Sequence, residues 1–228
     1  MGVLLLEGGA EFGGQMSLPD RKAIELAGGP DVPIRILPTA AAPDRNHVRA
    51  GNNGVRWFRE LGAKDVKSLA LIDSASAQAD EIVAELRNAK LIYLLGGFPD
   101  YLAKTLQLSP AWDAVLHAYH NGAVLAGSSA GAMVLCQYYF DPGAGRVQDG
   151  LNLLPNTCVL PHHNTFGKGW APRLLSQIPG VTLLGIDERT GLLDARDGQA
   201  RSVLGQGSVT VYRDTQVTRY TPGQTLAW

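Results

Sequence analysis

A segment rich in glycine and serine, Gly127-Ser128-Ser129-Ala130-Gly131, lies between two apolar stretches and has the residue types of a nucleophilic turn. The apolar run Ala123–Ala126 before it predicts a buried strand, and Ala132–Cys136 after it predicts the start of a buried helix. A strand, a tight turn and a helix with serine at the apex form the G-x-S-x-G nucleophile elbow. The segment therefore predicts catalysis by a serine. The alternative is a turn that only packs, or one that binds a phosphate at a helix N-terminus.

The spacing of the glycines distinguishes the two serines of this segment. The side chain at the apex of such a turn points outward, and the backbone two positions before and after it passes too close for a Cβ. Gly127 and Gly131 have this relation to Ser129, whereas Ser128 has alanines at that spacing. Ser129 is therefore the predicted nucleophile.

A serine nucleophile needs a histidine base within hydrogen-bond reach and an acid that orients the histidine. The pair His162-His163 follows Pro161 and the predicted strand Cys158–Leu160, which places it at the carboxyl end of a strand. Adjacent side chains leaving a strand point in opposite directions, so only one of the two histidines can be the base. Asp187 and Glu188 end a second short strand, and either could be the orienting acid.

The order of these residues along the chain is serine, histidine, acid. An α/β-hydrolase with the same elbow has the acid before the histidine, and no histidine follows His163 in this sequence. The sequence therefore does not fit an α/β-hydrolase, because that fold takes its base from a histidine that follows the acid. The histidine pair has no His or Cys cluster at ligand spacing beside it, so neither a metal nor another cofactor is expected.

Short apolar strands and amphipathic helices alternate about five times before the elbow, which predicts a parallel sheet with helices on both faces. The predicted strands are Val3–Leu6, Ile34–Leu37, Val66–Ile72, Leu91–Leu95 and Ala123–Ala126, and the predicted helices are Asp20–Ala27, His47–Leu61, Gln78–Ala89, Asp100–Leu106 and Ala111–Asn121. Ligands of such sheets bind at the carboxyl ends of the strands. The tail from Ala200 alternates polar and apolar residues, which predicts a small antiparallel addition.

Composition limits the class of protein. The chain has 228 residues, 45% of them hydrophobic and 18% charged, which suits a single α/β domain over residues 1–228. The formal net charge of -1 gives no reason to expect a nucleic acid or an anionic membrane as partner. Cys136 and Cys158 lie in apolar runs and are expected to be buried free thiols. Without an export signal or a membrane-spanning stretch, a cytoplasmic location is expected.

Three segments together resemble the S51 serine peptidase family, which contains peptidase E (aspartyl dipeptidase) and cyanophycinase. They are Gly127–Ala132, the pair Gly96-Gly97, and Gly185-Ile186-Asp187-Glu188-Arg189-Thr190. The resemblance covers nearly the whole chain in consistent order. It implies a three-layer α/β/α fold with a mainly parallel sheet, related to class I glutamine amidotransferases and flavodoxin-like, in which nucleophile, histidine and acid also occur in this order.

The resemblance also assigns site residues. The Leu160-Pro161-His162 match favours His162 over His163 as the base, and the cyanophycinase-like pattern favours Glu188 as the acid. Peptidase E has instead an aspartate soon after the nucleophile helix, for which Asp141 is the nearest candidate. The backbone N–H groups of Gly97 and Ala130 are predicted to hold the oxyanion.

The residues that bind the substrate are predicted less uniquely than the residues of the triad. Peptidase E removes an N-terminal aspartate, and Arg173 could bind that carboxylate, with Lys168 and Arg189 as weaker candidates. All three could equally form surface salt bridges. Phe98 stands where cyanophycinase has a glutamine, and only Lys168 and Arg173 stand where it has a run of arginines. These differences disfavour a β-Asp-Arg polymer as the substrate.

The expected function is hydrolysis of a short peptide by a Ser-His-Glu triad through an acyl-enzyme, as a dipeptidase or exopeptidase with an N-terminal aspartate as one preference. The alternatives are a serine esterase or amidase and a cyanophycinase-like hydrolase on the same fold. A further alternative is a non-catalytic module that binds an anion. The oligomeric state stays open, with a homodimer as one option.

Overall fold

The computed structural model describes residues 1–194 and 201–226. The helices are α1 (Ser17–Ala27), α2 (His47–Glu60), α3 (Asp80–Asn88), α4 (Pro99–Leu106), α5 (Pro110–His120), α6 (Ala130–Val134) and α7 (Ala171–Gln177). The strands are β1 (Val3–Glu7), β2 (Ile34–Leu37), β3 (Val66–Ser68), β4 (Leu91–Leu94), β5 (Val124–Ser128), β6 (Cys136–Asp141), β7 (Arg146–Asp149), β8 (Leu154–Leu160), β9 (Thr182–Ile186), β10 (Thr190–Asp194), β11 (Arg201–Gly205), β12 (Val209–Arg213), β13 (Gln216–Tyr220) and β14 (Thr225–Leu226).

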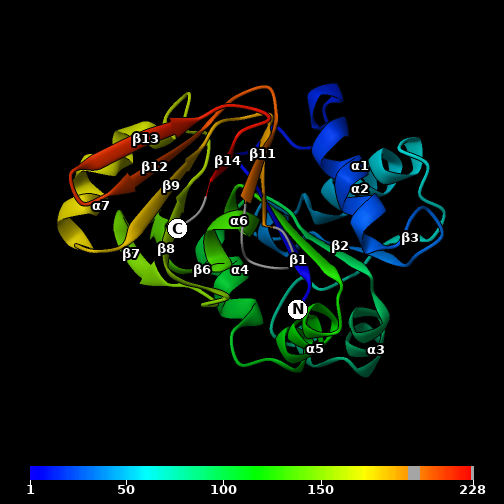
Figure 1. Ribbon diagram of the computed structural model, residues 1–228. Helices are drawn as coiled ribbons and strands as arrows, with labels where there is room; N and C mark the ends of the chain where they lie inside the picture. Colours follow the sequence, from blue (N-terminus) through cyan, green and yellow to red (C-terminus); the bar gives the residue numbers. More distant parts are fainter. Residues whose placement is uncertain (195–200, 227–228) are drawn as a thin grey trace.

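The first sheet contains β5, the strand directly before the predicted nucleophile Ser129, near its centre. Its order is β14-β11-β10-β1-β5-β4-β2-β3 among the described residues. The neighbouring strands from β1 to β3 in this order are parallel, whereas β10, β11 and β14 pair antiparallel. Helices α1 and α2 cover one face and α3 and α5 cover the other (Figure 1). Strands β1, β2, β4 and β5 are wholly buried and mostly apolar, as expected where helices cover both faces of a parallel sheet.

A second sheet follows α6, the helix directly after Ser129. Its order is β13-β12-β9-β8-β6-β7 in the described part of the chain, with β6, β8 and β9 parallel to one another and the outer strands antiparallel. Helix α7 packs on it over a core of its own that includes Leu160, Leu174 and Leu183. Helix α6 contacts β5 of the first sheet and β6 and β8 of the second, so it lies at the seam between them (Figure 1).

The prediction of one mainly parallel sheet was wrong. The strands that carry the histidines and the acids, β8 and β9, belong to the second sheet, because the free side of β1 is already paired with β10. The tail is antiparallel as predicted, but β11 and β14 extend the first sheet and β12 and β13 extend the second. The predicted strand Val66–Ile72 ends at Ser68, since its neighbour β2 ends at Leu37 before a proline. The flavodoxin-like classification and the single domain stay predictions.

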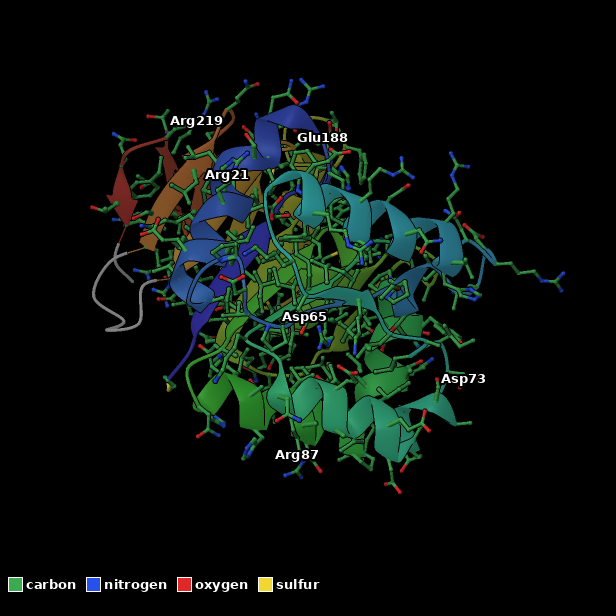
Figure 2. All side chains as sticks on the ribbon, turned by 90° about the vertical axis from the view of Figure 1, so that its right-hand side faces the viewer. Arg21, Asp65, Asp73, Arg87, Glu188 and Arg219 are labelled. Atoms are coloured by element: carbon green, nitrogen blue, oxygen red, sulfur yellow. The ribbon has the colours of Figure 1, made fainter. Side chains whose placement is uncertain are left out.

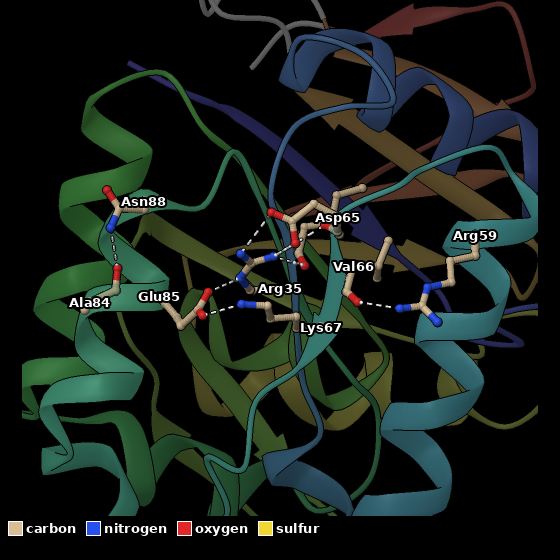
Figure 3. Close-up of polar contacts among 9 residues, drawn as sticks. Arg35, Arg59, Asp65, Val66, Lys67, Ala84, Glu85 and Asn88 are labelled. Carbon is tan, nitrogen blue, oxygen red and sulfur yellow. Dashed lines mark hydrogen bonds and ion pairs between the residues drawn. The ribbon is translucent and has the colours of Figure 1, made fainter.

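One ion-pair cluster fastens α3 to the first sheet. The buried Arg35 on β2 donates to Asp65 at 2.9 Å and to Glu85 of α3 at 2.6 Å, and Lys67 also pairs with Glu85 (Figure 3). These groups lie near the start of the parallel strands, opposite the edge where ligands bind such sheets. Their role is therefore structural. None of the helices in the described residues is long and apolar enough to cross a bilayer.

Candidate active site

The predicted nucleophile lies at the turn between β5 and α6. Ser129 has a φ of 49° and a ψ of -112°, a strained conformation for a residue with a side chain. A Cβ on Gly127 would lie 2.6 Å from the Gly131 carbonyl carbon, and a Cβ on Gly131 would lie 2.2 Å from the Leu94 oxygen. The flanking glycines are thus required by close backbone approach. The backbone N–H of Ser129 donates to the backbone carbonyl oxygen of Glu7 on β1 at 3.0 Å, which fixes the turn on the first sheet.

The histidine nearest this serine is His162, which follows β8. Ser129 Oγ and His162 Nε2 are 3.0 Å apart, and His162 Nδ1 is 2.8 Å from Glu188 Oε1, beyond β9. The imidazole stacks on Phe166 with centroids 4.9 Å apart, and a Cβ on Gly9 would lie 2.3 Å from its Cε1 atom. The ring is therefore held between the loop after β1 and its own loop. The His162 and Glu188 side chains are 20% and 28% exposed, so a substrate can reach them.

The alternative base and acids lie elsewhere. His163 and Asp187 point to the other side of their strands and pair with each other, with Nδ1 3.3 Å from Oδ1. Asp141 ends β6 in the second sheet, where its carboxylate accepts the Gly143 N–H at 2.9 Å. The structure therefore brings Ser129, His162 and Glu188 together. The alternative candidates His163, Asp187 and Asp141 lie outside this cluster.

Two predicted backbone donors border the serine. Ala130 begins α6 directly after Ser129. Gly97 has a φ of 138°, and a Cβ there would lie 2.3 Å from the Ala40 oxygen, so only glycine fits. Among the described residues, the Gly97 N–H has no protein acceptor. A Cβ on its neighbour Gly96 would lie 3.2 Å from the Ser129 Cβ, which shows how closely this loop approaches the nucleophile.

A cleft of about 590 Å³ opens beside this loop. Its walls are the loop after β1, the loop after β4 and one face of α2, and the predicted Phe98 lines it with 44% of its surface exposed. Its charged lining consists of Glu11, Asp44, Glu60 and one cation, Arg56. The cleft therefore carries an excess of negative charge.

Glu11 joins this cleft to the nucleophile turn through Ser128, and it was not among the predicted site residues. Its Oε2 accepts the Ser128 hydroxyl at 2.9 Å, and its Oε1 would lie 3.2 Å from a Cβ on Gly96. Its neighbours Ala10 and Phe12 both have positive φ, 60° and 61°. Backbone strain of this kind persists where function needs a side chain in one place. The signal in the sequence was the glycine pair directly after β1, which alone is weak.

The predicted substrate cations do not reach this cleft. The exposed Arg173 on α7 donates to the Gly145 oxygen, and its guanidinium lies 5.4 Å from the centre of the Phe140 ring. Lys168 lines a separate pocket of about 270 Å³ that also contains His163. In the described residues, no group of three or more His, Cys, Asp or Glu side chains could hold a metal ion.

A buried pair of acids lies beneath the nucleophile turn. Glu7, at the end of β1, accepts the Tyr93 hydroxyl, and Asp20 Oδ2 accepts the Trp57 indole N–H at 2.7 Å. Both carboxyl groups are wholly buried and within hydrogen-bond reach of each other. Burial raises the pKa of Asp20 to about 7 and raises the pKa of Glu7 well above its ordinary value. Glu7 Oε1 and Asp20 Oδ1 meet no donor among the described residues, so we expect the two carboxyl groups to share one proton.

Comparison with known proteins finds peptidases and cyanophycinases among the similar chains. The model of the family described as Peptidase family S51 matches residues 4–203. The cyanophycinases of Synechococcus elongatus and Thermosynechococcus vestitus (strain NIES-2133 / IAM M-273 / BP-1) are each 32% identical over 212 residues, covering 86% of this chain and 64% of theirs. The chain thus spans 64% of the length of these relatives.

Solved structures are similar over the whole fold. A crystal structure of a peptidase from an acI-B1 actinobacterium superposes with a TM-score of 0.90 and 29% identity, covering 100% of this chain and 97% of that one. A Listeria monocytogenes EGD-e protein named as a candidate peptidase E gives a TM-score of 0.62 at 19% identity, covering 97% of this chain and 98% of that one. At that identity the second match concerns the fold alone.

Proposed function

The chain belongs to peptidase family S51, and from this premise we propose that it is a serine peptidase that hydrolyses short peptides. The observation that carries the proposal is the hydrogen-bonded chain from Ser129 through His162 to Glu188, with separations of 3.0 and 2.8 Å. A nucleophile, a base and an orienting acid in this relation are the parts of a catalytic triad, whatever the fold that holds them.

The mechanism follows from these contacts. Ser129 Oγ attacks the scissile carbonyl carbon while His162 Nε2 takes the hydroxyl proton, and Glu188 stabilises the imidazolium through Nδ1–H. The oxyanion accepts hydrogen bonds from the Gly97 and Ala130 N–H groups. When the C–N bond breaks, His162 gives the proton to the leaving amine. Water then attacks the acyl-enzyme with His162 again as base, which releases the acid and restores Ser129.

The charge of the cleft supports one class of substrate. Glu11, Asp44 and Glu60 against the single Arg56 favour a cationic group of the peptide, from a basic side chain or a free α-amino group. We place that cation at Glu11 Oε1, since this carboxylate borders Gly96 next to Ser129. An N-terminal aspartate is less well matched, because Arg173 is engaged with the loop at Gly145 and not with the cleft.

A labelling and product experiment tests the proposal. The wild-type protein is treated with a fluorophosphonate probe, and the modified residue is identified by mass spectrometry of its proteolytic peptides; Ser129 is the expected site. A dipeptide and tripeptide library, with cyanophycin and p-nitrophenyl esters included, is then screened for products. Cleavage of basic peptides supports the proposal.

The other outcomes separate the alternatives. Turnover of esters without cleavage of any peptide would indicate an esterase, and cleavage of Asp-X dipeptides alone would restore the aspartyl dipeptidase. A folded protein that neither reacts at Ser129 nor cleaves any substrate would refute enzymatic function and leave the anion-binding module.

Glu11→Gln is expected to lower kcat/KM for a basic peptide about tenfold or more, because a charge-assisted hydrogen bond becomes a neutral one. The amide oxygen of glutamine can still accept the Ser128 hydroxyl, so the fold of the loop is kept. Steady-state kinetics on matched lysine and norleucine peptides measure the effect. Glu81→Gln, on the exposed face of α3, is the matched control. Equal kcat/KM values for Glu11→Gln and wild type would remove Glu11 from substrate binding.

A further inference from the structure

Two consecutive histidines meet two consecutive acids at the ends of β8 and β9. These strands are parallel neighbours, with Leu160 opposite Gly185, so the residues that follow them lie at the same level of the sheet. His162 pairs with Glu188 on the side of the nucleophile. On the opposite side, His163 Nδ1 lies 3.3 Å from Asp187 Oδ1. The second pair is therefore a buried counterpart of the first, formed by the adjacent residue in each of the two loops that follow β8 and β9.

The second pair belongs to a network of side-chain hydrogen bonds. His163 Nε2 is 2.8 Å from the Tyr212 hydroxyl. Asp187 Oδ2 accepts from the Ser208 N–H at 2.9 Å and from its hydroxyl at 2.7 Å, and Ser208 Oγ accepts from Arg219 Nε at 2.8 Å. Glu188 and Arg219 lie at the same end of the molecule, far from Arg87 of α3 (Figure 2). The network thus joins the end of β9 to β12 and β13.

The proton positions in this network follow from burial. Burial lowers the pKa of His163, and the nearby cations Lys168 and Arg219 lower it further, against the opposing effect of Asp187. A neutral ring donates Nδ1–H to Asp187 and accepts the Tyr212 hydroxyl at Nε2. The ring also packs on the backbone, since a Cβ on Gly185 would lie 2.3 Å from its Cδ2. His163 therefore has one position and one tautomer.

The backbone at His162 is strained and needs such support. His162 has a φ of 48°, in the left-handed region that side chains rarely adopt. Conformations of this kind cost on the order of 1–3 kcal/mol and persist where the surroundings fix them. The His162 N–H donates to the Gly8 oxygen at 2.7 Å on one side, and on the other side the His163 N–H donates to the Ile186 oxygen at 3.1 Å. The side chain of His163 adds the anchor to Asp187.

We propose that His163 and Asp187 are positioning residues for the reaction: their buried pair holds the strained backbone of His162, and with it the imidazole that faces Ser129 and Glu188. The inference rests on the proposed function, because it assigns a role in the same site. Neither residue touches the nucleophile, and both act through the residue next to them in the chain. Their loss affects the proton transfer and leaves the substrate cleft in place.

The test measures the rate constant for fluorophosphonate labelling of Ser129 between pH 5 and 9. His163→Phe keeps an aromatic ring on Gly185 and removes both hydrogen bonds. Its labelling rate is expected to fall roughly ten- to a hundredfold, since a misplaced base slows the reaction by such factors. In peptide kinetics, kcat falls and KM stays near its wild-type value.

Rescue and control variants make the outcome decisive. His163→Asn places an amide N–H near the former Nδ1 and is expected to recover much of the rate, whereas Asp187→Asn should resemble His163→Phe and replaces it if that variant does not fold. His117→Phe, at an exposed position on α5, is the matched control. Wild-type labelling rates and a wild-type kcat in folded His163→Phe and Asp187→Asn would overturn the positioning role alone. Failure of wild-type Ser129 to react would overturn this role together with the proposed peptidase.

Discussion

Ser129→Ala and His162→Ala are expected to lower kcat for peptide hydrolysis by similar factors, roughly 10⁴–10⁶, and the double variant is expected to be no slower than either one. The reason is that the two residues act as one unit: the hydroxyl is a weak nucleophile unless Nε2, 3.0 Å away, removes its proton. Residual turnover then comes from binding and from the N–H groups of Gly97 and Ala130. Single-turnover kinetics on the best peptide from the library measure the effect.

His117→Ala, which removes an exposed imidazole from α5, is the control for loss of a histidine. All variants are compared by circular dichroism and by thermal unfolding, so that lost activity is not confused with lost structure. Additive losses in the double variant would contradict the shared role of Ser129 and His162. Turnover by Ser129→Ala at the wild-type rate would contradict the triad itself.

The free energy of unfolding is expected to decrease between about pH 4 and pH 7, with a total loss of about 4 kcal/mol from Asp20. The pKa of this buried carboxyl is raised from 3.8 to about 7. A carboxyl that holds its proton more tightly in the folded protein stabilises the fold fully below its unfolded pKa. That stabilisation is lost as the pH rises through the folded pKa. Glu7, whose pKa is raised as well, extends the loss to higher pH.

The Glu7→Gln variant tests how much the proton shared by Glu7 and Asp20 contributes to the pH dependence of the free energy of unfolding. The amide can accept the Tyr93 hydroxyl and donate its own N–H to Asp20, so the bridge no longer depends on pH. Urea unfolding at pH 5, 6, 7 and 8 is expected to give a flatter profile for the variant, with a gain on the order of 1–3 kcal/mol at pH 8. Glu81→Gln, an exposed carboxyl on α3, should follow the wild-type profile. If the free energy of unfolding of wild-type protein does not fall across this range, the two acids do not share a proton.

Local chemistry was accessible from the sequence, because each glycine of the elbow has a steric reason. The same reasoning left His162 and His163 as alternatives, since a period of two residues says that adjacent side chains diverge but not which one meets the serine. The choice depends on which side of β8 faces the first sheet. That is a property of long-range packing, and the family resemblance supplied it before the geometry did.

The division into two sheets could not be predicted in this way. Short apolar strands such as β8 and β9 carry no local signal for their neighbours, and the antiparallel pairing of β10 with β1 joins residues far apart in the chain. Glu11 was missed for a related reason. A glutamate after two glycines resembles a solvated turn until the hydroxyl of Ser128 and the loop at Gly96 are brought against it.

The proposed nucleophile, Ser129, follows a strand of one sheet, and its proposed proton acceptor, His162, follows a strand of the other. The span between Ser129 Oγ and His162 Nε2 therefore measures how the two sheets are set against each other at α6. A displacement of about 1 Å between the sheets at α6 would break the hydrogen bond between Ser129 Oγ and His162 Nε2, while each sheet kept all of its own hydrogen bonds. Substitutions in the apolar contacts of α6 can thus abolish catalytic activity without touching Ser129 or His162, while the cleft and each of the two sheets keep their structure.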